Sequence, residues 1–209
     1  EDGRVQAILD MLEIPYTHSG VLASALAMNK VVAKRIFNIS GIRSPKYEVV
    51  CSTNFNKKIN FKKPYVLKPI NEGSSVGVHI VKKGDLAPNF DNMVWPFGDK
   101  VLVEEFINGR ELTVSIMGDR ALAVTEIKSL EGFYDYNAKY KVGGSEHITP
   151  AQIEVDIYDE ALKLAKVAHD CLGCRGVTRA DFRFYRPANS VPFDSVRKIS
   201  AESLGQNRT

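Results

Sequence analysis

The stretch that decides the fold reads Lys68-Pro69-Ile70-Asn71-Glu72-Gly73-Ser74-Ser75-Val76-Gly77-Val78. It follows the apolar run 65–67 and precedes a second apolar run, 78–81, so we predict a strand, a loop and a strand. A loop with two glycines and two serines can bring several backbone N–H groups close to an anion, and Lys68 adds a positive charge. The same residues also suit an ordinary solvated hairpin. Because the lysine precedes the glycines and no helical pattern follows, a phosphate site here would belong to a β-type nucleotide fold and not to a P-loop.

The composition is that of an ordinary globular protein that acts in water. The chain has 209 residues, 44% of them hydrophobic and 25% charged, which suits one large domain or two small ones. A net charge of +3, evenly spread, does not predict binding to nucleic acid. The sequence has no run of about 18 apolar residues, so we expect no membrane span. The first four residues carry no signal-peptide pattern, and three cysteines suit a reducing compartment, so the pattern favours the cytoplasm.

Helical spacing of apolar residues predicts four helices. They cover 5–12, stopped by Pro15; 21–28, with Ser19 as a possible N-cap; 30–40, capped by Asn29; and 154–171, ended by Gly173. On the third helix we interpret Lys34 and Arg35 as solvated. Cys171 and Cys174 form a C-x-x-C motif at the end of the fourth helix, and a structural role is favoured over redox chemistry or metal binding because no second pair exists.

Short apolar runs bounded by turn residues, and strict alternation in the last of them, predict seven strands. They cover 49–51, 65–67, 78–81, 101–107, 111–117, 121–127 and 177–185. Turns at 108–109 and 118–119 would join the strands from 101 to 127 into an antiparallel meander. By themselves Glu104, Glu105 and Glu111 are typical of edge charges that discourage aggregation.

Two later features indicate function more than structure. The segment 128–150 is long, lacks periodicity and holds four aromatic residues within 133–140, which favours a cover that packs on a site. In the strand 177–185, Arg179 and Asp181 fall on one face and point to the same place, although an exposed face of mixed charge has the same pattern. From Arg186 the periodicity ends, and we expect a poorly ordered tail.

Taken together and in this order, five motifs resemble those of the D-alanine–D-alanine ligases of the ATP-grasp superfamily. The motifs are Glu1-Asp2-Gly3 with Val5-Gln6; residues 16–30, from Tyr16-Thr17-His18-Ser19-Gly20 to Met28-Asn29-Lys30; Lys68-Pro69 with 72–77; Phe133-Tyr134-Asp135-Tyr136 with Ala138-Lys139-Tyr140; and 172–176 with Arg179-Ala180-Asp181. The resemblance covers about residues 1–184. It implies an α+β ATP-grasp fold in which two α+β subdomains hold the nucleotide between them. Residues 1–17 would be a remnant of an N-terminal substrate domain, 18–105 the central subdomain, 106–185 an incomplete C-terminal subdomain, and 186–209 a disordered tail foreign to the family.

The resemblance also implies a reaction. ATP would phosphorylate the carboxylate of one D-alanine, and the amine of a second D-alanine would attack the acyl phosphate, giving D-alanyl-D-alanine for peptidoglycan, cell wall biogenesis and cell shape. ATP and Mg²⁺ (or Mn²⁺) would be the cofactors, and the intact family enzyme would be a cytoplasmic homodimer with no membrane or nucleic-acid partner. Two alternatives stay open: an inactive nucleotide-binding remnant, and a ligase whose acceptor is D-lactate or D-serine.

By the same resemblance, specific residues receive roles. Lys30 and Lys68 would hold ATP phosphates, and Lys139 would reach the γ-phosphate. The loop with Glu72, Gly73, Ser74, Ser75 and Gly77 would close over them. The linker Glu104, Glu105, Phe106 and Ile107 would bind adenine, with Glu105 staying on the surface, and Glu111 would accept the ribose hydroxyls. Arg179 would stabilise the acyl-transfer transition state, Asp181 would bind the metal, and Glu1, Ser74 and Tyr140 would orient substrate and tie down the cover.

Two parts of the family pattern are missing from this sequence: nearly all of the N-terminal domain, and the Glu-x-Asn strand with its following Pro-Gly turn after Asp181. Without the latter, Asp181 would be the only metal ligand, and such a site would bind magnesium weakly. We interpret the break near Phe184 as a shifted or split reading frame. Ligase ancestry is therefore the prediction, whereas catalysis by this chain alone stays open.

Overall fold

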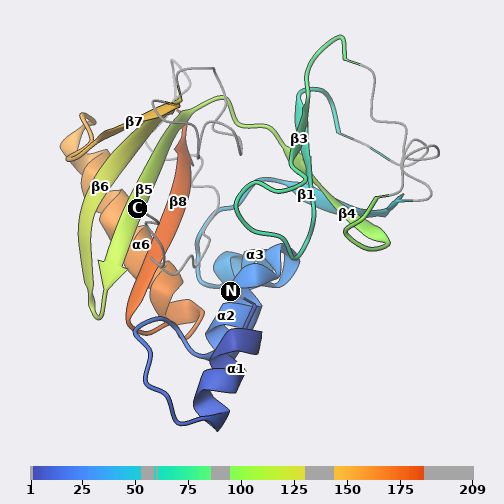
Figure 1. The fold of residues 1–209 in the computed structure, drawn as a ribbon. Helices are drawn as coiled ribbons and strands as arrows, with labels where there is room; N and C mark the ends of the chain where they lie inside the picture. Colours follow the sequence, from blue (N-terminus) through green and yellow to red (C-terminus); the bar gives the residue numbers. More distant parts are fainter. Residues whose placement is uncertain (1, 53–58, 60, 86–94, 130–143, 186–209) are drawn as a thin grey trace.

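The structure is a computed structural model, and it describes residues 2–52, 59, 61–85, 95–129 and 144–185. Two four-stranded antiparallel sheets stand side by side, with the short helices below and between them (Figure 1). Sheet A has the order β1-β4-β2-β3 and sheet B the order β7-β6-β5-β8. The α+β class predicted from the sequence is confirmed.

The strands of sheet A come from the first half of the chain. They are β1 (Tyr47–Cys51), β2 (Tyr65–Lys68), β3 (His79–Val81) and β4 (Lys100–Glu105). Because β4 lies between β1 and β2, it is a central strand, and Val101, Leu102 and Val103 are all fully buried. Leu67 and Val103 pack with Trp95 in the core of this sheet.

Sheet B and one helix form most of the larger core, which Ala27, Ala33, Phe37 and Ile42 also join. Its strands are β5 (Arg110–Met117), β6 (Arg120–Ser129), β7 (Ser145–Ile148) and β8 (Val177–Phe184), and helix α6 (Val155–Cys171) packs on β5, β6 and β8. The predicted alternation of β8 is confirmed, because Thr178, Ala180, Phe182 and Phe184 are all buried. Ala180, Phe182 and Phe184 belong to the same core as Ile157 of α6, which leaves Arg179, Asp181 and Arg183 on the other face.

The predicted meander is wrong at its first turn. β4 pairs with β1 and β2, whereas β5 pairs with β6 and β8, so the chain changes sheets between Glu105 and Arg110. At Gly109 a Cβ atom would lie 2.3 Å from the carbonyl oxygen of Phe184, so the backbone passes directly beside the end of β8. The second turn, between β5 and β6, is confirmed. Strand β7 falls in a segment where the sequence showed no periodicity; it pairs with the end of β6.

The short helices are α1 (Arg4–Met11), α2 (Val21–Met28) and α3 (Lys30–Ile39). Asn29 caps α3 as predicted, since its Oδ1 accepts from the backbone N–H of Val32 at 3.1 Å. The predicted cap of α2 is wrong, because Gly20 and not Ser19 precedes the helix. The Ser19 hydroxyl instead donates to the carbonyl of Arg175 at 3.0 Å and accepts from its N–H at 3.2 Å.

Residues 16–19 form a strap that lies against the turn before β8. The backbone N–H of Val177 donates to Thr17 O at 3.3 Å, and the Arg175 guanidinium lies 4.7 Å from the ring centre of Tyr16. Gly176 sits under the strap with φ +67°, in the left-handed region. The strap therefore adds backbone hydrogen bonds between the helical N-terminal segment and sheet B, whose core also contains Ala27, Phe37 and Ile42.

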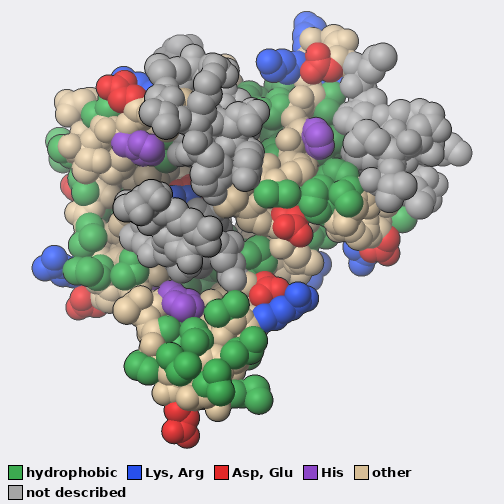
Figure 2. Space-filling model, in the orientation of Figure 1, with side chains coloured by type: hydrophobic (Ala, Val, Ile, Leu, Met, Phe, Trp, Pro, Cys, Tyr) green, Lys and Arg blue, Asp and Glu red, His purple; other side chains and the backbone are tan. Residues whose placement is uncertain are grey.

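The surface over α1 and α2 carries several exposed apolar side chains, visible at the lower end of the molecule in Figure 2. They include Val5, Ile8, Met11, Leu12 and Leu22. In the part of the chain that the structure describes, no helix combines the length and the apolar character that crossing a membrane requires.

Candidate functional site

The loop 69–78 has the strand–loop–strand setting predicted from the sequence, between β2 and β3. Ser74, Ser75 and Gly77 have φ values of 47°, 62° and 66°, all in the left-handed region. Two neighbouring non-glycine residues in that region are uncommon and cost backbone energy. At Gly77 a Cβ atom would lie 2.4 Å from the Phe97 ring, so glycine is required there. The loop is thus a tightly specified turn and not a generic hairpin connection.

Lys30 joins this loop to the start of α3. Its backbone N–H donates to Ile70 O at 3.0 Å, and its ammonium group donates to the carbonyls of Glu72 and, at 3.5 Å, Ile70. Lys30 is the first residue of the helix, so a positive side chain and the positive end of the helix dipole lie together beside the loop. This is a suitable environment for an anion.

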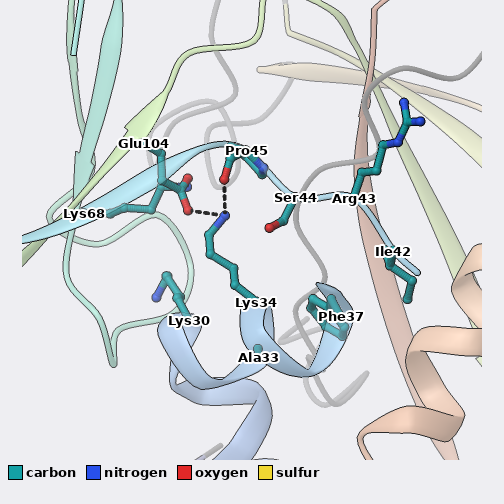
Figure 3. A pocket seen from close by; sticks show the side chains of 10 residues that line it. All are labelled: Lys30, Ala33, Lys34, Phe37, Ile42, Arg43, Ser44, Pro45, Lys68 and Glu104. Carbon is teal, nitrogen blue, oxygen red and sulfur yellow. Dashed lines mark hydrogen bonds and ion pairs between the residues drawn. The ribbon is translucent and has the colours of Figure 1, made fainter. Parts of the chain in front are cut away.

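Lys68, Glu104 and Lys34 form a buried ion triad (Figure 3). The Lys34 Nζ lies 2.9 Å from Glu104 Oε1, and the Lys68 ammonium pairs with Glu104 Oε2. Lys34 also donates to Pro45 O at 3.4 Å and lies 5.1 Å from the ring centre of Tyr47. The interpretation of Lys34 as solvated is therefore wrong, whereas Arg35 is exposed as predicted.

Glu104 is not the edge charge that its sequence suggested, because β4 is the central strand of its sheet. Burial would raise the pKa of Glu104, but the ammonium groups of Lys68 and Lys34 outweigh burial and lower the pKa to about 2. The carboxylate is thus ionised throughout the neutral and mildly acidic range.

The low pKa of Glu104 predicts a specific loss of stability in acid. The folded-state pKa of about 2 lies below the ordinary value of 4.5, so the contribution of Glu104 is complete above about pH 4.5 and is lost as the pH falls toward 2. We expect the free energy of unfolding in urea to fall more steeply between pH 5 and 2 in the wild type than in Glu104→Gln. Parallel curves for the two proteins would contradict the assignment.

A pocket beside the triad is lined by Lys30, Lys34 and Lys68. It is too small to hold a nucleotide. It encloses about 30 Å³, room for one or two waters. Its lining comes from α3, the segment that follows it, and the ends of β2 and β4, as Figure 3 shows. A phosphate would therefore approach Lys30 and Lys68 from outside this pocket.

On sheet B, Glu111 and Arg183 face each other across β5 and β8. The Arg183 guanidinium pairs with the Glu111 carboxylate and donates to Gly109 O at 3.3 Å. Glu111 is therefore half-buried and held in place, and the edge-charge interpretation is wrong for it as well. The predicted linker residues Glu105, Phe106 and Ile107 are half-buried. We expected Glu105 on the surface, and it is only partly exposed.

Arg179 and Asp181 meet on the same face, as the alternation predicted. Arg179 Nε lies 3.0 Å from Asp181 Oδ1, its NH2 group donates to Oδ2 at 3.2 Å, and the Thr113 hydroxyl donates to Oδ1 at 2.7 Å. Asp181 is buried, so the alternative of an exposed face of mixed charge is wrong. Among the described residues, no three His, Cys, Asp or Glu side chains are grouped so as to hold a metal ion.

The remaining predicted site residues are placed only in part. Glu1, Lys139 and Tyr140 lie outside the described residues, together with the aromatic cover 133–140. Cys171 and Cys174 are free thiols whose pKa values are raised, chiefly by burial, which favours the protonated form and agrees with a structural role.

Sequence reasoning missed three residues of this region: Lys34, Thr113 and Arg183. Lys34 lies one helical turn after Lys30, so the spacing i, i+4 could have placed both on one face. Thr113 and Arg183 become visible only when β5 and β8 are paired, because their partners are 68 and 72 residues away.

Comparisons with known proteins identify one family of ligases. The family model for the D-ala D-ala ligase C-terminus matches residues 36–196, a range that runs past Phe184. A D-alanine–D-alanine ligase of Paramagnetospirillum magneticum is 54% identical over 203 residues, which are 97% of this chain and 65% of that protein. One of Granulibacter bethesdensis is 50% identical, covering 88% of this chain and 60% of that protein. The solved VanG D-Ala:D-Ser ligase of Enterococcus faecalis superposes with a TM-score of 0.75 at 29% identity, covering 96% of this chain and 59% of that one. This chain thus spans about three fifths of the length of these relatives.

Proposed function

This chain belongs to the D-alanine–D-alanine ligase family, and on that premise we propose that it takes part in the ATP-dependent joining of two D-alanines for peptidoglycan. One observation carries the proposal: Lys30 of α3, which bonds the tightly turned loop 69–78, and Lys68 of β2, which leads into that loop, line the same pocket. Two ammonium groups beside a glycine- and serine-containing turn are the donor set that a polyphosphate needs.

In this proposal the residues act mainly by position and charge, which is what phosphoryl transfer requires of a protein. Lys30 and Lys68 hold the phosphates of ATP, and the loop 73–77 closes over them. The linker 104–107 receives adenine, and Glu111, fixed by Arg183, accepts the ribose hydroxyls. Arg179 stabilises negative oxygens of the acyl-transfer step. Glu1, Lys139 and Tyr140 complete the site through the cover, with Ser74 orienting substrate.

The proposal includes a division of the ligase fold into two subdomains near Glu105. The change from sheet A to sheet B between Glu105 and Arg110 supports it, since each sheet has its own hydrophobic core. The family resemblance implies a cytoplasmic homodimer, and we propose this location and this oligomeric state for the intact enzyme.

The described residues do not fit a complete Mg²⁺ or Mn²⁺ site. Asp181 is the one predicted ligand, and both its oxygens already accept bonds from Arg179 or Thr113. Magnesium needs several oxygen ligands in a fixed geometry. This observation favours a second candidate function, in which the chain binds ATP without turning it over.

Phosphate release from ATP by the full chain tests the proposed function, with L-alanine in place of D-alanine as the matched control. We expect release that depends on D-alanine and yields D-alanyl-D-alanine, measured by coupled phosphate assay and mass spectrometry. ATP binding without release would favour the second candidate, and release that ignores D-alanine would contradict the ligase assignment. D-serine and D-lactate as acceptors test the remaining alternative.

A further inference from the structure

We propose that Lys34 is a positioning residue of the nucleotide site: it keeps the buried Glu104 carboxylate paired, so that Lys68 can turn its ammonium group toward a phosphate. The inference rests on the proposed function, because it takes a polyphosphate as the ligand of Lys68. It concerns a residue to which neither the sequence pattern nor the resemblance assigned any role.

The geometry separates the tasks of the two lysines. Lys34 Nζ takes Oε1 of Glu104 and Lys68 takes Oε2, so the two cations bind different oxygens of one carboxylate. Pro45 O, at 3.4 Å, and the Tyr47 ring hold Lys34 on the side of α3 and β1. Lys68 is instead the last residue of β2 and leads directly into the loop 69–78. Lys68 is therefore placed to reach a phosphate at the loop, whereas Lys34 stays paired with Glu104.

Burial makes this pairing necessary. Glu104 is 3% exposed, Lys34 7% and Lys68 8%, so water does not solvate these charges effectively. A buried carboxylate that loses its cation is strongly unfavourable. If Lys68 moved to a phosphate without Lys34 present, it would leave Glu104 in that state, and the cost would be subtracted from the binding energy of the nucleotide.

The charge balance leads to the same conclusion. Two lysines and one glutamate leave the triad with one net positive charge, and Lys30 adds another beside the loop. Without Lys34 the pair of Lys68 and Glu104 would be neutral. Lys34 thus supplies the surplus charge that attracts a polyphosphate, although its own ammonium group stays behind Glu104.

The test compares binding of ATP and of inorganic tripolyphosphate, by calorimetry at pH 7.5, to the full-length wild type and four variants. We expect Lys34→Met to weaken both ligands about 10-fold or more, the loss of roughly one charge-assisted hydrogen bond. Lys34→Arg should restore binding to within a few-fold, because arginine keeps the charge. Lys166→Met, which removes an exposed ion pair on α6, should bind like the wild type.

The double variant Lys34→Met/Glu104→Gln distinguishes positioning from a merely structural role. With no carboxylate to satisfy, losing Lys34 should cost little, and binding of tripolyphosphate, which has no adenine for the linker 104–107 to receive, should recover toward that of the wild type. Unchanged binding in Lys34→Met, or an equal loss in the double variant, would overturn the inference. Thermal unfolding of each variant confirms that it is folded. Failure of the wild type to bind either ligand would instead refute the proposed function, and the inference with it.

Discussion

Gly176→Ala is expected to lower the free energy of unfolding by about 3 kcal/mol or more. An added Cβ would lie 1.8 Å from Thr17 O and 2.8 Å from Thr17 C. Both are backbone atoms, so the strap 16–19 would have to move as a whole. The hydrogen bonds of Val177 to Thr17 and of Ser19 to Arg175 would be lost with it. The strap joins α2 to the turn before β8, so the helical segment would lose these backbone contacts beside sheet B, while Ala27 and Phe37 still pack in the core of that sheet.

Gly173→Ala provides a matched control for this variant. Gly173 has the same φ of +67° but no atom within 4 Å of an added Cβ. It should show only the left-handed backbone cost of about 1 kcal/mol. Urea unfolding followed by circular dichroism measures both variants. Equal losses in the two would mean that the strap does not press on Gly176 as described.

Lys68→Ala is expected to weaken ATP binding about 100-fold or more. The variant removes the ammonium group at the end of β2, and a charge-assisted hydrogen bond to a phosphate contributes about 1.5–3 kcal/mol. It also removes one of the two cations that neutralise the buried Glu104, which further disfavours an anion nearby.

Lys100→Ala is the control for Lys68→Ala, because Lys100 lies on the neighbouring strand β4 and is exposed. Both variants lose one positive charge from sheet A, so a general effect of charge would appear in both. Calorimetric titration with ATP should separate them, with circular dichroism confirming the fold. Equal affinities of Lys68→Ala and Lys100→Ala would place the nucleotide elsewhere.

The elements of this fold could be predicted from the sequence because their signals are local. The apolar spacing of α2 and α6 and the alternation of β8 need no partner to be recognised. The division into two sheets could not, because Asn108-Gly109 has the chemistry of a hairpin turn. What decides the pairing is distant: Arg110 lies opposite Phe184, and Tyr47 lies opposite Glu104.

The arrangement of the candidate site was predictable to the same extent. The pattern of the loop and Lys68 indicated an anion site, and the resemblance implied Lys30. The burial of Glu104 was not visible, since a glutamate after an apolar run suits an edge as well as a central strand. Lys34 was missed for a related reason: a lysine on an amphipathic helix is usually solvated, and only the position of β4 across from α3 makes it part of an ion triad.

A crystal structure of the full chain with a non-hydrolysable ATP analogue would show directly whether Lys30 and Lys68 hold the nucleotide. We expect phosphate oxygens within hydrogen-bonding distance of both Lys30 and Lys68, beside the loop 69–78, with Lys34 still paired with Glu104. A nucleotide bound away from these two lysines, or a Lys68 that stays on Glu104 while the phosphates lie elsewhere, would contradict it.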